Sequence, residues 1–503
     1  METPTNRLHV AGVFVLDPPA GDPVSPGARF EEIRSVVAQR LERVPRLLRR
    51  PFRVPFDLQR PAWLEEQDVD IDAHVRRATV GEPGGARELD ALVGELLSHE
   101  LPLDRPLWEM VVAEGIEGGR TAVVARLHHA VLDGVAGVRA MAAFLDLAPV
   151  AERRADDRAD DRADDRADDR AGRLDGPGAG GVLTRARSGG TPPPSSLDVW
   201  RYAAASLCEQ PEAVRCALRR SADALVELAA QNRELAAAGA APPPSLFSAP
   251  RTSLNGNVSA ARHFATVSVP LADIELVRRK SGGGATVNDV VLCAVGGALL
   301  QLLERRGDIP ERSLVALVPV STRGPAPEPR SGRAHVGNDI SGMLVSLGTT
   351  LRDPLERLRE VARGSRVAKQ QEQRAGGDFL ETLTRAIPPV VTAGVMRGIE
   401  RLRLFDRFPP PFNVVVSSVA VPDVQLFWAG SPVAQIYPAG PVAAGVGVNI
   451  TSMTYKGVVR FGLVGCPVLV PDIDELAVLL GDAVAELVSA SRAPRRPPGP
   501  RGS

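Results

Sequence analysis

Apolar residues recur along this chain at two spacings, one typical of helices and the other typical of strands. In residues 28–44 they fall at every third or fourth position, which places Phe30, Ile33 and Val37 on one helical face, and Pro45 is expected to end the helix. We expect further helices at residues 87–100, 200–238, 286–305 and 472–490.

Shorter apolar runs bounded by turn-forming residues predict strands. Residues 108–112 and 121–127 flank the triplet Glu-Gly-Gly at positions 117–119, and they predict a hairpin of two buried strands. Further strands are expected at residues 9–16, 264–269, 314–320, 413–419 and 446–452. Together these elements predict a mixed α/β fold built in two halves.

The longest uncharged run, residues 424–455, is interrupted by glycines and prolines and contains the polar residues Asn449 and Thr451. A membrane-spanning helix needs about 20 consecutive apolar residues, so we expect buried strands and turns here instead. The first residues show no charged segment followed by an apolar one, and no secretory signal is expected. The sequence therefore predicts a soluble or peripheral protein.

The two halves are joined by a connection of unusual composition. Residues 155–170 repeat the unit Ala-Asp-Asp-Arg, which in a helix would stack like charges at positions i and i+4 and leave no apolar face. We expect this segment to be disordered. The predicted division is an N-terminal domain, a low-complexity linker, a helical connection with a loop, a C-terminal domain and a tail, at residues 1–150, 151–195, 196–250, 251–492 and 493–503.

Composition narrows the classes of function. The chain has 503 residues, of which 44% are hydrophobic, so it can bury a large core. Its net charge is −1 and no basic domain stands out, so nucleic acid is not an expected partner. The 4 cysteines form no CxxC pair and no zinc spacing, which fits a reducing compartment without disulfides. One of them, Cys293, lies in an apolar helix and is expected to belong to the core.

The sharpest chemical feature is the run His-His-Ala-Val-Leu-Asp-Gly at residues 128–134, directly after a predicted strand. Neighbours in a strand point to opposite faces, so only one of His128 and His129 can face a given cleft. An imidazole titrates near neutral pH and can take a proton from an alcohol and return one to a leaving group. Asp133 is placed to brace the loop by pairing with a cation, and Gly134 permits a turn that a side chain would hinder.

Two other interpretations of this run are core histidines near a turn and a metal site. Four specified residues at fixed spacing arise by chance on the order of once in a thousand chains of this length, which favours a function. Adjacent strand histidines diverge and no third ligand is evident, so we expect no metal. The other histidines have no motif around them and are expected to be structural, namely His9, His74, His99, His263 and His335.

Residues 128–134 match the HHxxxDG motif of the wax ester synthase/diacylglycerol acyltransferase family, a motif that nonribosomal peptide condensation domains also carry. Residues 102–104 and 106–109 resemble the PLW region of this family, and residues 286–290 resemble its ND motif. In the second half the similar residues are 318–323, 337–338, 353–354, 357–358, Asn413, 417–418, Pro422, Gly430, 437–438 and Asn449. The resemblance covers nearly the whole chain except the repeat and the tail.

The resemblance implies a fold like that of chloramphenicol acetyltransferase, with two mixed α/β domains and the active site in a channel at their interface. It implies an O-acyltransferase that moves a long-chain acyl group from acyl-CoA to diacylglycerol, and by extension to long-chain alcohols. His129 would be the general base, with His128 and Asp133 beside it. No cofactor is expected apart from acyl-CoA as co-substrate. Residues 1–4 look like the middle of the region that precedes the first strand in the family, which leaves open whether the chain starts upstream of Met1.

Several residues of these motifs have structural interpretations as well. Trp108 of the PLW-like segment is expected to be a packing residue at the start of a strand. Asn288 and Asp289 are expected to support the site, although a pair at a helix start can also serve as an N-cap. We expect Arg323 to pair with Asp133 across the cleft, because a buried carboxylate needs a cation; the alternatives are that it binds a CoA phosphate or points to water.

Two alternative functions stay open from the sequence alone. One is an acyltransferase that takes its acyl group from a carrier protein, and the other is a non-catalytic protein of lipid bodies. The expected location is the cytoplasm, peripherally attached to the inner membrane or to lipid droplets, because the substrates are lipids. The acceptor preference, the acyl chain length and the oligomeric state are not fixed by any short motif.

Overall fold

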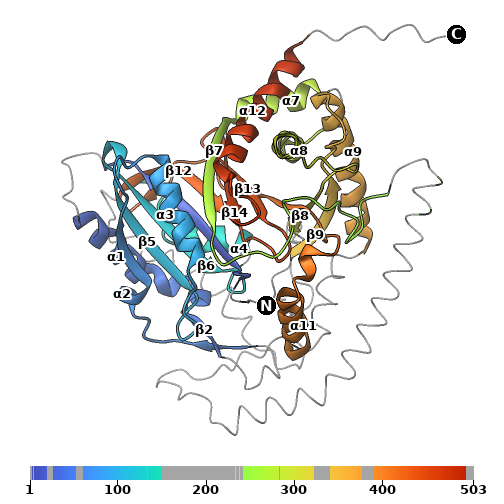
Figure 1. Cartoon of the computed structure of the whole chain (residues 1–503). Helices are drawn as coiled ribbons and strands as arrows, with labels where there is room; N and C mark the ends of the chain where they lie inside the picture. Colours follow the sequence, from blue (N-terminus) through green and yellow to red (C-terminus); the bar gives the residue numbers. More distant parts are fainter. Residues whose placement is uncertain are drawn as a thin grey trace, which may run out of the picture.

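The computed structural model describes residues 3, 5–19, 27–52, 61–132, 134–149, 233, 237, 242–281, 284–321, 340–375 and 389–493. The repeat at residues 155–170, most of the helix expected at 200–238, the tail, Asp133, Arg323 and His335 lie outside this part of the chain. In the described part, two six-stranded sheets with helices packed against them form the body of the molecule (Figure 1). This confirms the predicted mixed α/β fold.

The first sheet holds the histidine motif at the end of one of its central strands. Its strand order is β11-β12-β1-β6-β5-β4, and the hairpin predicted around residues 117–119 is formed by β5 and β6. The bounds are β1 His9–Leu16, β4 Val75–Thr79, β5 Trp108–Ile116, β6 Arg120–His128, β11 Phe427–Trp428 and β12 Ser431–Ala439. Helices α1 (Ala28–Arg40) and α4 (Gly134–Ala142) pack on one face, and α3 (Ala86–Ser98) packs on the other.

The second sheet has the strand order β7-β14-β13-β10-β8-β9. Its bounds are β7 His263–Pro270, β8 Val315–Ser321, β9 Ile340–Ser346, β10 Val414–Ala420, β13 Val448–Tyr455 and β14 Val458–Gly465. The largest hydrophobic cluster of the protein lies between this sheet and α7 (Leu271–Lys280), α8 (Val287–Arg306), α9 (Pro354–Ala375) and α12 (Ile473–Arg492).

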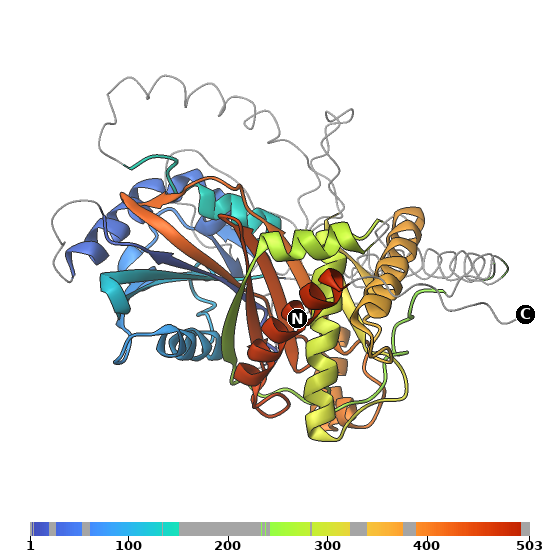
Figure 2. The same ribbon diagram turned by 90° about the horizontal axis from the view of Figure 1, so that it is seen from above.

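The first sheet includes two strands from the second half of the sequence. Strands β11 and β12 come from the second half of the sequence, yet β12 pairs antiparallel with β1 in the first sheet. Seen from above, the orange β12 lies beside the blue strands of the first half (Figure 2). The uncharged run at residues 424–455 therefore forms strands, as predicted, and links the two sheets.

The predicted helices are present within a few residues of their expected bounds wherever they lie in the described part. The helix expected at residues 28–44 is shorter, because α1 stops at Arg40 and the chain continues as the 3-10 turns η1 (Leu41–Arg43) and η2 (Pro45–Leu48). Helix α8 is long and apolar enough to cross a membrane, but 78% of its most apolar window is buried inside the protein. Its burial identifies it as a core helix.

Smaller elements complete the fold. Strands β2 (Arg49–Phe52) and β3 (Ala62–Glu65) form a separate hairpin, followed by the short helix α2 (Ile71–His74). Helix α11 (Pro389–Arg401) and the 3-10 turn η7 (Leu404–Asp406) project from the lower end of the molecule in Figure 1, far from α7 and α12.

Candidate active site

The two motif histidines sit where β6 ends. His128 is the last residue of β6 and pairs with His9 of β1. The backbone N–H of His129 still donates to the carbonyl oxygen of Leu8, at 2.8 Å, so the ladder continues one residue further before the chain turns. His128 is buried and His129 is half-buried.

His128 is built into the turn that follows. Its Nδ1 accepts a hydrogen bond from the backbone N–H of Ala130, at 3.0 Å, and its carbonyl oxygen accepts one from Val131, at 2.9 Å. The first of these bonds requires that Nδ1 carry no proton. The ring also lies edge-on to that of His9, with 6.0 Å between the centroids. His128 thus shapes the loop that carries the rest of the motif, and its buried neighbour His9, for which the sequence indicated no special role, belongs to the same cluster.

The motif loop lies at the junction of the two sheets. Gly134 begins α4, and α4 packs against β10 of the second sheet. Val131 and Leu132 are buried in the cluster that also contains Met453 and Tyr455 of β13. Asp133 and its expected partner Arg323 lie outside the described residues, so the brace between them stays a prediction.

Strands β10 and β13 contribute hydroxyl groups near this junction. Ser418 donates to Oδ1 of Asn288, at 3.0 Å, and shares a 2.8 Å hydrogen bond with Ser452. On the neighbouring positions Ser417 and Thr451 share a 2.7 Å bond. The sequence singled out Asn288, Ser417-Ser418 and the polar Thr451, but it gave no sign that these groups would meet or that Ser452 would join them.

Asn288 and Asp289, adjacent in the sequence, act differently. Thr286 caps α8 and accepts a bond from the backbone N–H of Asp289, while the Asp289 carboxylate accepts from the backbone N–H and hydroxyl of Thr286, each at 2.8 Å. This is a capping box, which satisfies orphan donors at the helix start. Asn288 takes no part in the cap and is directed to Ser418.

A buried ion pair lies on the same strand as the histidines. Arg126, two residues before His128, is 3% exposed and donates to Glu109 at 2.6 Å and to the carbonyl oxygens of Leu96 and His99 at the end of α3. Burial lowers the pKa of Arg126, and the charge of Glu109 opposes that shift. The pair therefore fixes α3 to β6 close to the motif.

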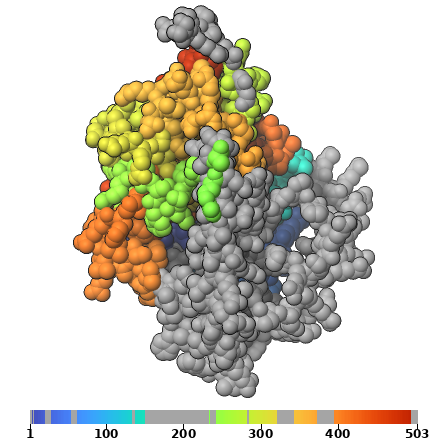
Figure 3. All heavy atoms as spheres, turned by 90° about the vertical axis from the view of Figure 1, so that its right-hand side faces the viewer, coloured from blue at the N-terminus to red at the C-terminus, as the bar shows by residue number. Residues whose placement is uncertain are grey.

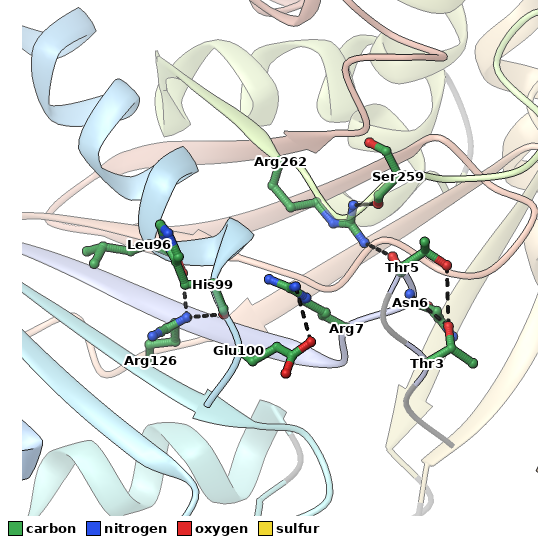
Figure 4. A network of polar contacts seen from close by, with 10 residues as sticks. All are labelled: Thr3, Thr5, Asn6, Arg7, Leu96, His99, Glu100, Arg126, Ser259 and Arg262. Atoms are coloured by element: carbon green, nitrogen blue, oxygen red, sulfur yellow. Dashed lines mark hydrogen bonds and ion pairs between the residues drawn. The ribbon is translucent and has the colours of Figure 1, made fainter. Parts of the chain in front are cut away.

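The chain before β1 forms an arm across the junction, drawn in Figure 4. The buried guanidinium of Arg262 donates to the carbonyl oxygen of Thr5, at 2.8 Å, and the hydroxyl of Thr3 donates to Glu400 of α11, at 2.6 Å. Arg7 pairs with Glu100 at 3.3 Å. The arm ends at Leu8, whose carbonyl holds the backbone of His129, so it ties the motif to both halves of the molecule.

A carboxyl group connects α3, which packs on the first sheet, to β7 of the second sheet. Asp90 of α3 accepts hydrogen bonds from the backbone N–H and the hydroxyl of Thr266 on β7, both at 3.1 Å. Burial, reinforced by the charge of Asp474, raises the pKa of Asp90 to about 7.

Other candidate groups have structural surroundings. Cys293 is buried in the core, and burial raises the pKa of its thiol to about 12, which leaves it without nucleophilic thiolate near neutral pH. Trp108 donates from its indole N–H to Leu47 at 2.8 Å and stacks on His74, as expected for a packing residue. In the described part, no group of three His, Cys, Asp or Glu side chains is placed to hold a metal ion.

Two hollows of about 450 and 500 Å³ lie beside the PLW-like segment. Both are lined by Ala73 and Arg105, and neither includes a residue of the histidine motif. They are surface features of the first half and do not mark the reaction centre.

Comparisons with known proteins agree with the motif. The family model of the wax ester synthase/diacylglycerol acyltransferase catalytic domain matches residues 1–291, and that of the C-terminal domain matches residues 336–488. A putative diacylglycerol O-acyltransferase of Mycobacterium tuberculosis strain H37Rv is 30% identical over 494 residues, which cover 98% of this chain and 88% of the relative. A probable diacylglycerol O-acyltransferase of the same strain, tgs2, is 30% identical over 497 residues, which cover 97% and 96%.

Solved structures show the same fold. The wax ester synthase/diacylglycerol acyltransferase from Marinobacter aquaeolei VT8 superposes with a TM-score of 0.64 at 24% identity, covering 98% of this chain and 96% of that one. The trichothecene 15-O-acetyltransferase TRI3 from Fusarium sporotrichioides gives a TM-score of 0.54 at 11% identity, covering 97% and 91%.

Proposed function

Because this chain belongs to the wax ester synthase/diacylglycerol acyltransferase family, we propose that it is an acyltransferase that moves a long-chain acyl group from acyl-CoA to the free hydroxyl of diacylglycerol, with His129 as the general base. The products are triacylglycerol and free CoA. Long-chain alcohols are the second class of acceptor, since the family's description names wax ester synthesis as well.

The acyl group is transferred directly from CoA to the acceptor, with one proton transfer before the bond exchange and one after it. His129 takes the proton of the acceptor hydroxyl, and the oxygen attacks the thioester carbonyl carbon. As the new ester C–O bond forms, the C–S bond breaks, and His129 returns its proton to the departing CoA sulfur. General base catalysis of this kind contributes typically about 10²–10⁴-fold, and positioning of the two substrates adds to it.

One observation supports the choice of His129 over His128. The Nδ1 atom of His128 accepts the backbone N–H of Ala130, and its buried ring packs against His9, which gives His128 a structural task. His129 is half-buried and stands one residue beyond the strand, at the junction where α4 meets β10. Strand alternation directs it away from the face that His128 occupies.

A donor-by-acceptor activity matrix on the purified protein tests the proposal. Palmitoyl-CoA and palmitoyl acyl-carrier protein serve as donors, and dioleoylglycerol and hexadecanol serve as acceptors. We expect ester formation with equimolar CoA release from palmitoyl-CoA, and the faster rate with dioleoylglycerol. Turnover with the carrier protein alone would favour the condensation-type alternative. No turnover in any combination would favour a non-catalytic lipid-body protein.

A further inference from the structure

Exposed apolar side chains lie on helix α11, in the segments on either side of the turn η7, and in a neighbouring loop. Val395, Leu402, Phe408 and, from the neighbouring loop, Phe247 are each more than half exposed. Val395 and Leu402 are seven residues apart and therefore share one helical face. The backbone N–H of Phe247 donates to the carbonyl oxygen of Pro411, at 3.3 Å, which brings the loop next to the segment after η7. Single exposed apolar residues are ordinary, but a group of this kind marks an interaction site.

Arginines border this apolar group. Exposed arginines are present on the helix, in the turns after it and on the neighbouring loop: Arg251, Arg397, Arg401, Arg403 and Arg407. Arg251 lies beside Arg407, since its Nη1 donates to the Arg407 carbonyl oxygen at 3.3 Å. We call the four apolar residues and these five arginines the α11 surface.

Two acidic side chains lie in this region, Glu400 and Asp406. Glu400 accepts a bond from Thr3 of the N-terminal arm, at 2.6 Å. Asp406 accepts hydrogen bonds from Arg403, at 2.6 Å, and from the backbone N–H of Asn257, at 2.7 Å. Desolvation raises the pKa of Asp406, but these hydrogen bonds and the charges of Arg403 and Arg251 together lower it below its usual value. The carboxylates of Glu400 and Asp406 offset part of the arginine charge, and the five arginines leave the α11 surface positive as a whole.

The surroundings of α11 show that this face is not part of the core. Among the described elements, η7 is the one that packs closely against it. The helix stands at the lower end of the molecule in Figure 1, and the orange atoms of this stretch protrude at the edge of the space-filling view in Figure 3.

From this combination we propose that the α11 surface docks the protein on an anionic phospholipid surface. Apolar side chains that reach the headgroup boundary, with arginines beside them, are the two elements of interfacial binding by a helix that lies on a membrane. The positive charge of the arginines disfavours a purely apolar partner. The exposed Leu402 and Phe408 supply apolar area that can be buried at the headgroup boundary, which a purely electrostatic contact would not use. This proposal rests on the proposed function in one respect, namely that the substrates of the enzyme are lipids.

The position of this surface relative to the histidine motif fits that purpose. Glu400 is bonded to Thr3, and the arm runs from there to Leu8, whose carbonyl oxygen holds the backbone of His129. The docked face and the catalytic loop are thus connected by one short segment, of which Figure 4 shows Thr3, Thr5, Asn6 and Arg7. A diacylglycerol dissolved in the lipid surface would be presented to the end of the molecule that this arm joins to the motif.

The test is vesicle flotation with the full chain and without substrate. The probe vesicles contain equal parts of phosphatidylglycerol and phosphatidylcholine, and vesicles of phosphatidylcholine alone serve for comparison. We expect binding to the anionic vesicles that weakens as NaCl is raised. Arg401→Gln/Arg407→Gln should bind about 25-fold more weakly, because each arginine near an anionic surface contributes about fivefold. Leu402→Ser/Phe408→Ser should bind roughly tenfold more weakly.

Matched controls lie at the opposite end of the molecule, on α7 and α12. Arg278→Gln/Arg279→Gln and Val478→Ser remove the same kinds of exposed side chain there, and they should bind like the wild type. His129→Ala should also bind like the wild type, which separates docking from catalysis. Equal loss in the patch and control variants, or no binding of the wild type at low salt, would overturn the proposal. It would also fall if the wild type ignores vesicles and is a dimer that Leu402→Ser/Phe408→Ser dissociates.

Discussion

At the scale of single residues, the two adjacent histidines of the motif have different surroundings, and the difference comes from one hydrogen bond. Nδ1 of His128 occupies the position from which it can accept the backbone N–H of Ala130 and stabilise the turn. The sequence predicted that the two rings would diverge, because they are neighbours in a strand. It could not predict that His9 would be the partner of His128, since that contact depends on the register between β1 and β6.

This difference predicts contrasting effects of two substitutions at His128. Asparagine places Oδ1 where histidine has Nδ1, so His128→Asn should keep the turn and most of the activity. His128→Ala loses the acceptor for Ala130 and should lower the free energy of unfolding by about 1 kcal/mol more than His128→Asn does. Urea denaturation and kcat of both variants provide the measurement, and identical behaviour would argue against the structural role.

Asp90 is the residue for which a pH effect is expected. Its pKa of about 7 in the folded protein lies above the value of 3.8 for an exposed aspartate. The folded state therefore holds a proton that the unfolded state has lost between these values, and stability falls as pH rises through this window, by about 1.4 kcal/mol per unit at most. The groups that face the carboxyl are Thr266 of β7 and, by its charge, Asp474 of α12.

Asp90→Asn should remove this pH dependence, because an amide can still accept the bonds from Thr266 and carries no proton to lose. We expect the variant to be less sensitive to pH than the wild type between about pH 5 and 7, and more stable than the wild type at about pH 8. The exposed Asp482 on α12 offers a matched control, and Asp482→Asn should leave the profile unchanged. A wild-type profile that is flat over this range would show that Asp90 is already ionised.

At the scale of elements, apolar periodicity predicted the helices and strands that have a single buried face or a buried centre. It located β5, β6, α3, α8 and α12, with α3 burying Leu89, Val93 and Leu97 on one side. It did not locate β9, or α9, although α9 buries Leu358, Val361 and Ala362 at helical spacing. Element type is encoded locally, while sheet partners and helix ends are set by contacts far along the chain.

At the start of α8, the adjacent residues Asp289 and Asn288 are expected to contribute differently to stability. Asp289→Ala breaks the capping box and leaves the backbone N–H of Thr286 without its acceptor, so it should lower the free energy of unfolding by about 1–2 kcal/mol. Asn288→Ala loses one bond to the exposed Ser418 and should cost less than about 1 kcal/mol. Thermal or urea unfolding of the two variants decides, and a larger loss for Asn288→Ala would contradict this assignment.

At the scale of the whole molecule, the pairing of β12 with β1 makes the two halves interdependent. β12 covers the edge of β1, and its residues Val433 and Ile436 join the same hydrophobic cluster as Phe14. A sequence divided at the connection between residues 150 and 251 gives no sign of this, because the pairing joins segments more than four hundred positions apart. The candidate site also depends on both halves, because the motif loop packs on strands from the second half.

Residues 1–150 expressed alone should therefore fail to fold, since they leave β1 as an unpaired edge and expose its apolar cluster. Co-expression with residues 242–503 as a second chain should restore a soluble complex that contains both fragments. Circular dichroism and urea titration of the isolated fragment provide the measurement. Cooperative unfolding of residues 1–150 by themselves would contradict the interdependence.

The central claim, that His129 is the base of a direct acyl transfer, is tested most directly by kcat for CoA release in His129→Ala. The variant must first match the wild type in circular dichroism and in its urea midpoint. With palmitoyl-CoA and dioleoylglycerol, we expect kcat to fall by about 10²–10⁴-fold while KM for either substrate changes little. A correctly folded His129→Ala protein that keeps most of the wild-type kcat would contradict the claim.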